Sequence, residues 1–296
     1  MSAFSGGPSG PLDLGMSPFR SSGPPPARRR IDRTIVKSTS IALVSSVVFF
    51  GLLAIVVVNA PNWPEVRDQF FDPHWFSYSL PKIVGAFAVN VQLFCVAEVL
   101  ILILALFLAV LRGLPGPVFF PLRLIATIYA DIFRAIPGLL LIGLLGFGIP
   151  GLGIAGVPTD TFLYAVVALT LVYSAYVSEV YRSGIESIHP SQEAAARSLG
   201  LTRIQALRYV ILPQAVRRVI PPLLNDFIGL QKDTILVSYI GVVEAFRESA
   251  IISGAKFNYT PEVALALVFL VVTIPLARFT DWLVVRDRRR FAANAQ

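Results

Sequence analysis

Six long stretches of the sequence consist mainly of apolar residues, and each is at least 20 residues long. A helix needs about 20 such residues to cross the hydrocarbon core of a bilayer. The composition agrees, because 55% of the residues are hydrophobic and 15% are charged, against roughly 45–50% and 25% in soluble domains. This excludes a disordered protein and argues against an ordinary soluble enzyme. We predict an all-α polytopic membrane protein with spans at Ile41–Ala60, Ile83–Leu111, Phe119–Phe147, Thr161–Tyr181, Pro222–Val242 and Pro261–Trp282.

The sequence before the first span has a different character. Residues 1–27 are rich in Ser, Gly and Pro and lack any hydrophobic period, which is typical of disorder. A secretory signal peptide does not fit, because the apolar run begins only at Ile41 and no small-residue cleavage site follows it. We therefore predict a disordered, basic cytoplasmic tail at residues 1–40 and a first span at residues 41–60.

Basic residues are unevenly shared between the two sides of the membrane. With the N-terminus in the cytoplasm, the cytoplasmic segments contain sixteen Lys and Arg residues and the opposite segments contain four. Such an excess marks the cytoplasmic side. Both termini are therefore predicted to be cytoplasmic, which agrees with six spans. The net charge of +7 fits this membrane reading, and no basic patch interleaved with aromatic residues indicates nucleic acid binding.

Few residues are available for metal or disulfide chemistry. Cys95 is the one cysteine, and His74 and His189 are the two histidines. A disulfide within the chain is therefore impossible, and a Cys/His metal cluster is not expected. The spans also contain no combination of residues typical of an intramembrane catalytic site.

The longest connection between spans, residues 183–221, is too polar to cross a bilayer but favours helices. Ser191 is predicted to cap a first short helix, and Gly200 is placed to end it. Thr202 and Gln205 have the spacing of a capping box that starts a second helix. The resulting corner can dock against another protein or lie on lipid as an amphipathic hairpin. The residue pattern alone leaves both alternatives open.

Prolines predict the ends and bends of several helices. Pro213 is expected to interrupt the second helix of the 183–221 connection. Pro221 and Pro222 are expected at the start of the fifth span, and Thr260-Pro261 at the start of the sixth, because proline is favoured in the first helical turn.

Ionisable residues also lie within or beside the apolar stretches. A charge facing lipid at the bilayer centre costs about 2.5–3.5 kcal/mol, so these side chains must face protein, water or one another. Two pairs have the i, i+3 spacing that allows contact on one helix face, and a third pair is adjacent and needs partners on other helices. The predicted structural ion pairs involve Asp131 with Arg134, Glu179 with Arg182, and Lys232 with Asp233.

One buried acid is a candidate for contact with a transported solute. Glu98 has no nearby basic residue in its own span, and an ionisable residue at that depth is by default a functional hypothesis. Asn90 and Gln92 precede it in the same span, and Asn225 and Asp226 lie in the fifth. We predict that these five residues line a transport pathway.

The 183–221 connection resembles the signature loop of bacterial ABC importer permeases. The shared residues are Glu193–Ala195, Gly200 and Val210–Pro213, although Glu193 lies seven residues before Gly200 where the family usually has six, so that Ala194 takes the glutamate position. Other segments resemble motifs of the polar amino acid branch of this family, over about residues 83–285: Ala130–Pro137, Tyr176–Ile185, Leu207–Ala215, Asn225–Phe227 and Lys232–Thr234.

The resemblance implies a type I ABC importer transmembrane fold, with a five-span core and one extra N-terminal span. Residues 83–285 would form the ABC permease transmembrane domain, and 183–221 the cytoplasmic coupling loop within it. The loop residues that would contact the ATPase are Glu193, Ala194, Ala195, Gly200, Leu201 and Thr202.

The resemblance also implies a function and partners. The chain would be a permease subunit of an ATP-driven importer for amino acids, located in the bacterial inner membrane and surrounded by lipid. Its partners would be a cytoplasmic ABC ATPase dimer, a second identical or homologous permease, and an extracytoplasmic amino acid-binding protein. The sequence has no G-x-x-x-x-G-K-[ST] loop, so ATP would be used by the partner, and the chain itself would be neither an enzyme nor a cofactor protein. The alternatives are a permease for another small polar solute, or a secondary transporter, which commonly has two related halves.

Overall fold

The computed structural model describes residues 33–294, so most of the predicted tail lies outside the described residues. Within that range every regular element is helical. The chain divides into two compact units, one ending at Pro61 and the other beginning at Asn62. The first unit contains one described helix, α1 (Arg33–Val58), whose Ser40–Val58 portion is long and apolar enough to cross a membrane.

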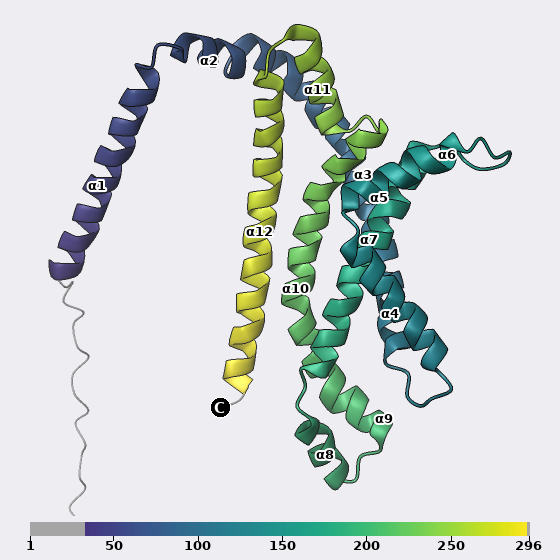
Figure 1. The fold of residues 1–296 in the computed structure, drawn as a ribbon. Helices are drawn as coiled ribbons and strands as arrows, with labels where there is room; N and C mark the ends of the chain where they lie inside the picture. The colour runs from purple at the N-terminus through teal and green to yellow at the C-terminus, as the bar shows by residue number, and fades with distance from the viewer. Residues whose placement is uncertain (1–32, 295–296) are drawn as a thin grey trace, which may run out of the picture. The chain divides into compact units, whose positions relative to one another are not determined.

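The second unit is built around three long helices (Figure 1). These are α3 (Pro73–Arg112), α7 (Thr161–Glu186) and α12 (Thr260–Asn294). The shorter elements are α2 (Trp63–Phe70), α4 (Phe120–Ala135), α5 (Gly138–Gly143), η1 (Leu144–Gly148), α6 (Ile149–Gly151), α8 (Pro190–Ser198), α9 (Arg203–Ala206), η2 (Leu207–Ile211), α10 (Leu212–Asp233), η3 (Thr234–Ile240) and α11 (Ala245–Lys256).

Four helical stretches in the described range are long and apolar enough to span a membrane. A fifth span is obtained if α4 and the α5–α6 stretch are counted together, although they are bent by 101°. The bend follows from Pro137, because a residue before proline avoids the helical region. Ile136 accordingly has an extended backbone, with ψ of 128°. The polytopic, all-helical prediction is therefore confirmed, with four or five spans supported by length and composition.

The predicted start of the fifth span was wrong. The helix there, α10, begins at Leu212, ten residues before Pro222, and it carries Arg217 and Arg218 in its first half. The proline in its first turn is Pro213. Pro221 and Pro222 lie inside the helix instead. Because of its charged residues, α10 does not pass as an apolar span on composition alone.

The sequence had suggested that Pro213 interrupts the preceding helix. In the structure the helical path continues through Pro213. The chain widens into a π-helical turn, η2, in which the Leu212 N–H donates to the Leu207 carbonyl five residues earlier. In an ordinary α-helix the proline ring would clash with the carbonyl four residues before it, which is that of Tyr209. The wider turn relieves this clash, so α9, η2 and α10 follow one another without a break.

Helix α7 lies at the centre of the second unit. It packs against α3, α4, α5 and α10, and many of its buried residues are small, including Ala165, Ala168 and Ala175. At Gly184 the backbone approaches α10 so closely that an added Cβ would overlap the side chain of Val219. Small residues on α7 therefore hold α10 against it at the root of the 183–221 connection, which we call the loop end of the unit.

The opposite end of the unit joins α2, α11 and the beginnings of α3 and α12. Ile83 of α3 packs with Ala245 of α11 and with Ala264 and Leu265 of α12. Thr260 begins α12, as predicted, and its hydroxyl accepts a hydrogen bond of 3.1 Å from the Asp72 N–H, at the start of α3. This end is therefore held together by contacts between elements almost 190 residues apart in the chain.

Candidate functional site

The 183–221 connection contains the first arm of the predicted corner, helix α8. Its N-cap is His189, whose Nδ1 accepts a hydrogen bond from the Ser191 N–H at 3.2 Å. Pro190 occupies the first turn. The prediction that Ser191 caps this helix was therefore wrong by two residues, because an imidazole nitrogen can serve as the acceptor in place of a hydroxyl.

Gly200 ends this arm in the left-handed conformation, with φ of +86°. Two hydrogen bonds close the turn: the Gly200 N–H donates to the Arg197 carbonyl at 3.0 Å, and the Leu201 N–H donates to the Ala196 carbonyl at 3.3 Å. This is the Schellman arrangement, in which glycine is favoured because L side chains disfavour a positive φ. No atom lies within 4 Å of a Cβ built at Gly200, so the conformation and not the available space requires glycine.

The second arm begins at Thr202 with the predicted capping box. The Thr202 Oγ1 accepts from the Gln205 N–H at 3.3 Å, and the Gln205 Oε1 accepts from the Thr202 N–H at 2.9 Å. Both bonds are local and satisfy backbone donors at the start of the helix. Since α9, η2 and α10 are continuous, the second arm of the corner leads directly into α10.

The corner presents apolar side chains to its surroundings. Leu199 is 83% exposed and Ile204 is 78% exposed, whereas Ala196 and Ala206 are buried between the arms. Glu193 on the first arm lies 3.9 Å from Arg203 on the second. The two arms are thus joined on their inner side, and the outer side offers an apolar contact surface.

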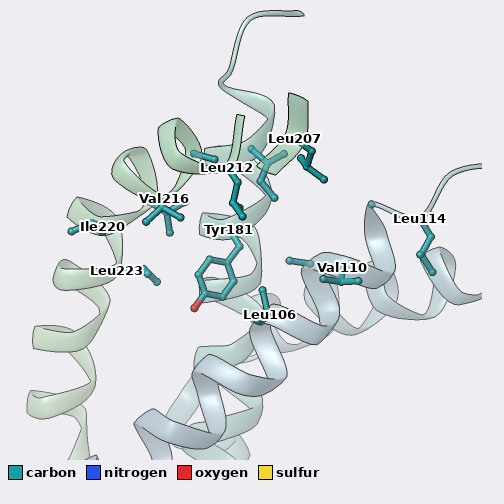
Figure 2. Close-up of a pocket in the computed structure, with 14 residues that line it drawn as sticks. Leu106, Val110, Leu114, Tyr181, Leu207, Leu212, Val216, Ile220 and Leu223 are labelled. Atoms are coloured by element: carbon teal, nitrogen blue, oxygen red, sulfur yellow. The ribbon is translucent and has the colours of Figure 1, made fainter. Parts of the chain in front are cut away.

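An apolar groove of about 470 Å³ lies at the root of this loop. Figure 2 shows Leu106 and Val110 of α3 on one side and Val216 and Ile220 of α10 on the other, with the Tyr181 ring between them. Leu207 and Leu212 line the end nearest the corner. The start of α10 is therefore not packed tightly against α3 at the loop end.

Near the loop end, three arginines surround a single carboxylate. Glu179 of α7 lies 2.8 Å from Arg112 of α3 and 3.9 Å from Arg134 of α4, and it also pairs with Arg182 on its own helix. The Glu179–Arg182 contact is the one expected from the sequence. The predicted Asp131–Arg134 pair does not form, because the Arg134 guanidinium lies toward α7 and above the Tyr176 ring. Within the described part of the chain, Asp131 has no ion-pair partner.

Lys232 and Asp233 do not form a pair with each other. Asp233 accepts a hydrogen bond of 2.7 Å from the Tyr173 hydroxyl on α7, so it has a partner on another helix, as its position in the sequence suggested. Lys232 is exposed, and no acid of the described range forms a salt bridge with it.

The five predicted pathway residues occupy different environments. Asn90 is 1% exposed and makes three side-chain hydrogen bonds, to Thr234, Glu244 and Ala245. Gln92 and Asn225 are exposed. Glu98 on α3 and Asp226 on α10 are both half-buried. The Asp226 Oδ2 atom is buried without a hydrogen-bond partner.

Residues 101–289 match the family described as the binding-protein-dependent transport system inner membrane component. This range covers more than half of the chain, including the corner, the groove and most of the helices of the second unit. The chain belongs to this family. The resemblance of its motifs to ABC importer permeases is thereby confirmed.

Individual relatives of this permease are also named as permease proteins. It is 36% identical over 175 residues to the probable glutamine ABC transporter permease protein GlnM of Bacillus subtilis, covering 59% of this chain and 80% of the relative. It is 37% identical over 207 residues to the glutamate transport system permease protein GluC of Corynebacterium efficiens, covering 66% and 90%. Among solved structures, an amino acid ABC transporter crystallised with histidines has a TM-score of 0.64 and 31% identity, covering 70% and 94% of the two chains.

Sequence reasoning missed two residues of the permease. Arg112 entered only the count of basic residues on the cytoplasmic side. In the structure it lies closer to Glu179 than Arg134 does. Glu244 is 0% exposed and caps α11, where its carboxylate accepts from the Asn90 amide and from the Phe246 and Arg247 N–H groups. Burial raises the pKa of the Glu244 carboxyl, and these donors oppose the rise. Glutamate is not among the residues usually found at an N-cap, so no local signal in the sequence marked Glu244.

Proposed function

We propose that this chain is the permease subunit of an ATP-driven importer that carries amino acids across the bacterial inner membrane. The glycine corner, set between two spans of a chain that belongs to the binding-protein-dependent family, carries the proposal. Relatives named for glutamine and glutamate, and the related amino acid ABC transporter, support the substrate class. A permease for another small polar solute is the alternative, because membership of the binding-protein-dependent family does not by itself fix the solute.

The corner would dock on a cytoplasmic ABC ATPase dimer, because the chain has no phosphate-binding loop of its own. The exposed Leu199 and Ile204 would be covered in that complex. Movement of the corner would pass through η2 into α10, and the groove beside α10 leaves room for this helix to approach α3. A second permease, identical or homologous, would complete the pathway, and an extracytoplasmic amino acid-binding protein would deliver the solute.

The proposed topology has six spans with both termini in the cytoplasm. The five-span core would occupy residues 83–285. One of its spans would be α10, which composition alone does not identify as a span. Residues 41–60 would form the additional N-terminal span. Packing supports a spanning α10, because it lies along α7 and α12 (Figure 1). Lipid would then be largely excluded from its charged residues.

Two single cysteines test this topology in a Cys95→Ala background. Both Thr159 and Leu199 are exposed. A membrane-impermeant thiol reagent is expected to label Thr159→Cys in intact cells and Leu199→Cys only after permeabilisation. Labelling of both from outside would contradict the orientation.

The half-buried acids Glu98 and Asp226 would contact the ammonium group of the solute. Neither forms a salt bridge with a described residue, and a nearby cation favours the charged form of a half-buried carboxylate. Replacing Glu98 by glutamine is expected to raise the KM of uptake about tenfold, since a hydrogen bond to a charged group contributes about 1.5–3 kcal/mol.

Glu98→Asp is the control for that change, because it keeps the charge and shortens the side chain. It is expected to raise the KM less than Glu98→Gln does. Unaltered uptake kinetics in Glu98→Gln, with equal amounts of protein in the membrane, would remove Glu98 from the pathway.

Uptake of labelled amino acids by cells with and without the gene tests the proposed function. We expect the deletion to lose uptake of one group of amino acids and the restored gene to recover it. Unchanged uptake of every amino acid would overturn the amino acid assignment, and the panel would then be extended to other small polar solutes.

A further inference from the structure

Aromatic side chains gather at the end of the second unit opposite the loop end, where α2 and α11 meet the beginnings of α3 and α12. Those that reach the surface include Phe70, Phe71, Trp75, Tyr78, Phe257 and Tyr259. No charged residue follows Lys82 in α3 until Glu98. Trp and Tyr are enriched where a spanning helix passes from hydrocarbon to water. We therefore expect the membrane boundary at this end to lie near Lys82.

Two lysines from different helices lie over two of these rings. The Lys82 Nζ of α3 lies 3.9 Å from the centre of the Tyr78 ring and donates to the Tyr78 hydroxyl at 2.7 Å. The Lys256 Nζ of α11 lies 5.5 Å from the centre of the Trp75 ring. The two rings meet edge to face, with centroids 5.6 Å apart. We call these four residues the two-lysine cluster.

The positive charge of the two-lysine cluster is not neutralised within the described part of the chain. Lys82 and Lys256 are both exposed, and neither forms a salt bridge with an acid there. Glu248 precedes Lys256 on α11 but makes no salt bridge with either lysine. Lys82 uses one of its three N–H donors on Tyr78. Both ammonium groups therefore have donors available for an anion.

Phe257 follows Lys256 in a conformation that is unfavourable for its residue type. It caps the end of α11 with φ of +52°, and among the described residues it is the one non-glycine residue with a positive φ. A bulky L residue is an outlier in this region. The Phe257 residue is 84% exposed, so packing within the unit offsets little of the strain. An apolar phase around the ring would offset it, because the ring would then leave water.

We propose that this surface binds an anionic phospholipid at the membrane boundary. The lipid phosphate lies against the Lys82 and Lys256 ammonium groups, with the Trp75 and Tyr78 rings at the level of the headgroup. The Phe257 ring lies beside the first methylenes of the acyl chains. Two cations without an acid partner match the charge of the lipid, and the exposed ring matches the apolar phase. An acidic protein would match the lysines alone. This site is independent of which solute the permease carries.

Lipid-dependent thermal stability of the purified full-length chain in detergent tests the site. Phosphatidylglycerol is expected to raise the unfolding temperature about 2–4 °C more than phosphatidylcholine does, because a ligand that binds the folded state stabilises it. Phosphatidylcholine has the same phosphate, but its cationic choline is repelled by the lysines. Lys82→Gln with Lys256→Gln is expected to abolish the difference. Inorganic phosphate, added alone, is expected to have no effect, and an equal response to it would overturn the lipid assignment.

Arg67→Gln is the matched control for the loss of charge. Arg67 is an exposed cation at the same end, but it already pairs with Asp68, so this variant is expected to keep the full difference between the two lipids. A double lysine variant that also keeps the difference would overturn the site, as would a wild-type protein that responds equally to both lipids. Solute uptake enters neither measurement, so failure of the proposed transport function would leave the result unchanged.

Phe257→Asn tests the role of the ring separately. Asparagine tolerates a positive φ, so without lipid this variant is expected to unfold at or above the wild-type temperature. With phosphatidylglycerol it is expected to gain less than the wild type does, because the apolar contact is lost. A lower unfolding temperature without lipid, or an undiminished gain with it, would overturn the lipid contact of Phe257.

Discussion

Replacing Gly200 by valine is expected to lower uptake about tenfold or more. A left-handed backbone costs an L residue about 1–2 kcal/mol, and a β-branched residue more, and each 1.4 kcal/mol corresponds to a factor of ten in an equilibrium. The two hydrogen bonds that close the corner require this backbone conformation. Valine would therefore favour a different corner, and the ATPase would lose its docking surface. Uptake and ATPase activity of the complex, with the amount of permease in the membrane, are the measurements.

Gly200→Asn is the matched control. Asparagine is similar in size to valine but tolerates the left-handed conformation, and nothing within 4 Å of the Cβ position would clash with either residue. Asparagine is therefore expected to keep most of the uptake. Equal losses in the two variants would mean that size at the docking surface matters and that backbone conformation does not. Equal, undiminished uptake would favour the alternative of a hairpin lying on lipid.

The corner was largely predictable because its signals are local. The glycine turn and the Thr202–Gln205 capping box depend on residues within five positions of one another, and such spacings can be read from a sequence directly. The cap at His189 was missed because histidine is an unusual N-cap residue and Ser191, a common one, stands two positions later.

Contacts between distant segments were not predictable in the same way. Arg134 is three residues from Asp131 but pairs with Glu179, 45 residues away, because the bend after α4 and the packing on α7 decide what each side chain faces. Asn90 bonds to Glu244, 154 residues away, a partner that the residues around Asn90 do not indicate. A single sequence shows that a buried polar residue needs a partner, but the fold selects the partner.

The prolines near α10 show a third limit on predicting the structure from the sequence. A proline predicts either a helix start or a break, and three of them lie within ten residues here. The chain resolves the first with a π-helical turn and encloses the other two in the helix. Packing against α7 and α12 therefore overrides the preference of proline to start or break a helix. The same packing stabilises α10, whose full length could not be recognised in the sequence because of its charged residues.

Replacing Glu179 by glutamine is expected to destabilise the permease by about 1–3 kcal/mol, because its removal leaves several partly buried arginines without their shared counter-charge. Three arginines from α3, α4 and α7 converge on this carboxylate, and the Arg112 side chain is 13% exposed. Glutamine keeps the shape and one acceptor but removes the charge. Thermal unfolding of the purified protein in detergent measures the effect.

Glu186→Gln is the matched control, since Glu186 also pairs with Arg182 but its side chain is 60% exposed, against 23% for Glu179. Exposed pairs contribute only about 0–1 kcal/mol, so this variant is expected to unfold close to the wild-type temperature. Similar unfolding of both variants would mean that the three arginines are solvated independently of Glu179. A large difference would show that one carboxylate ties α3 and α4 to α7, so that α10 can move at the loop end against helices that stay together.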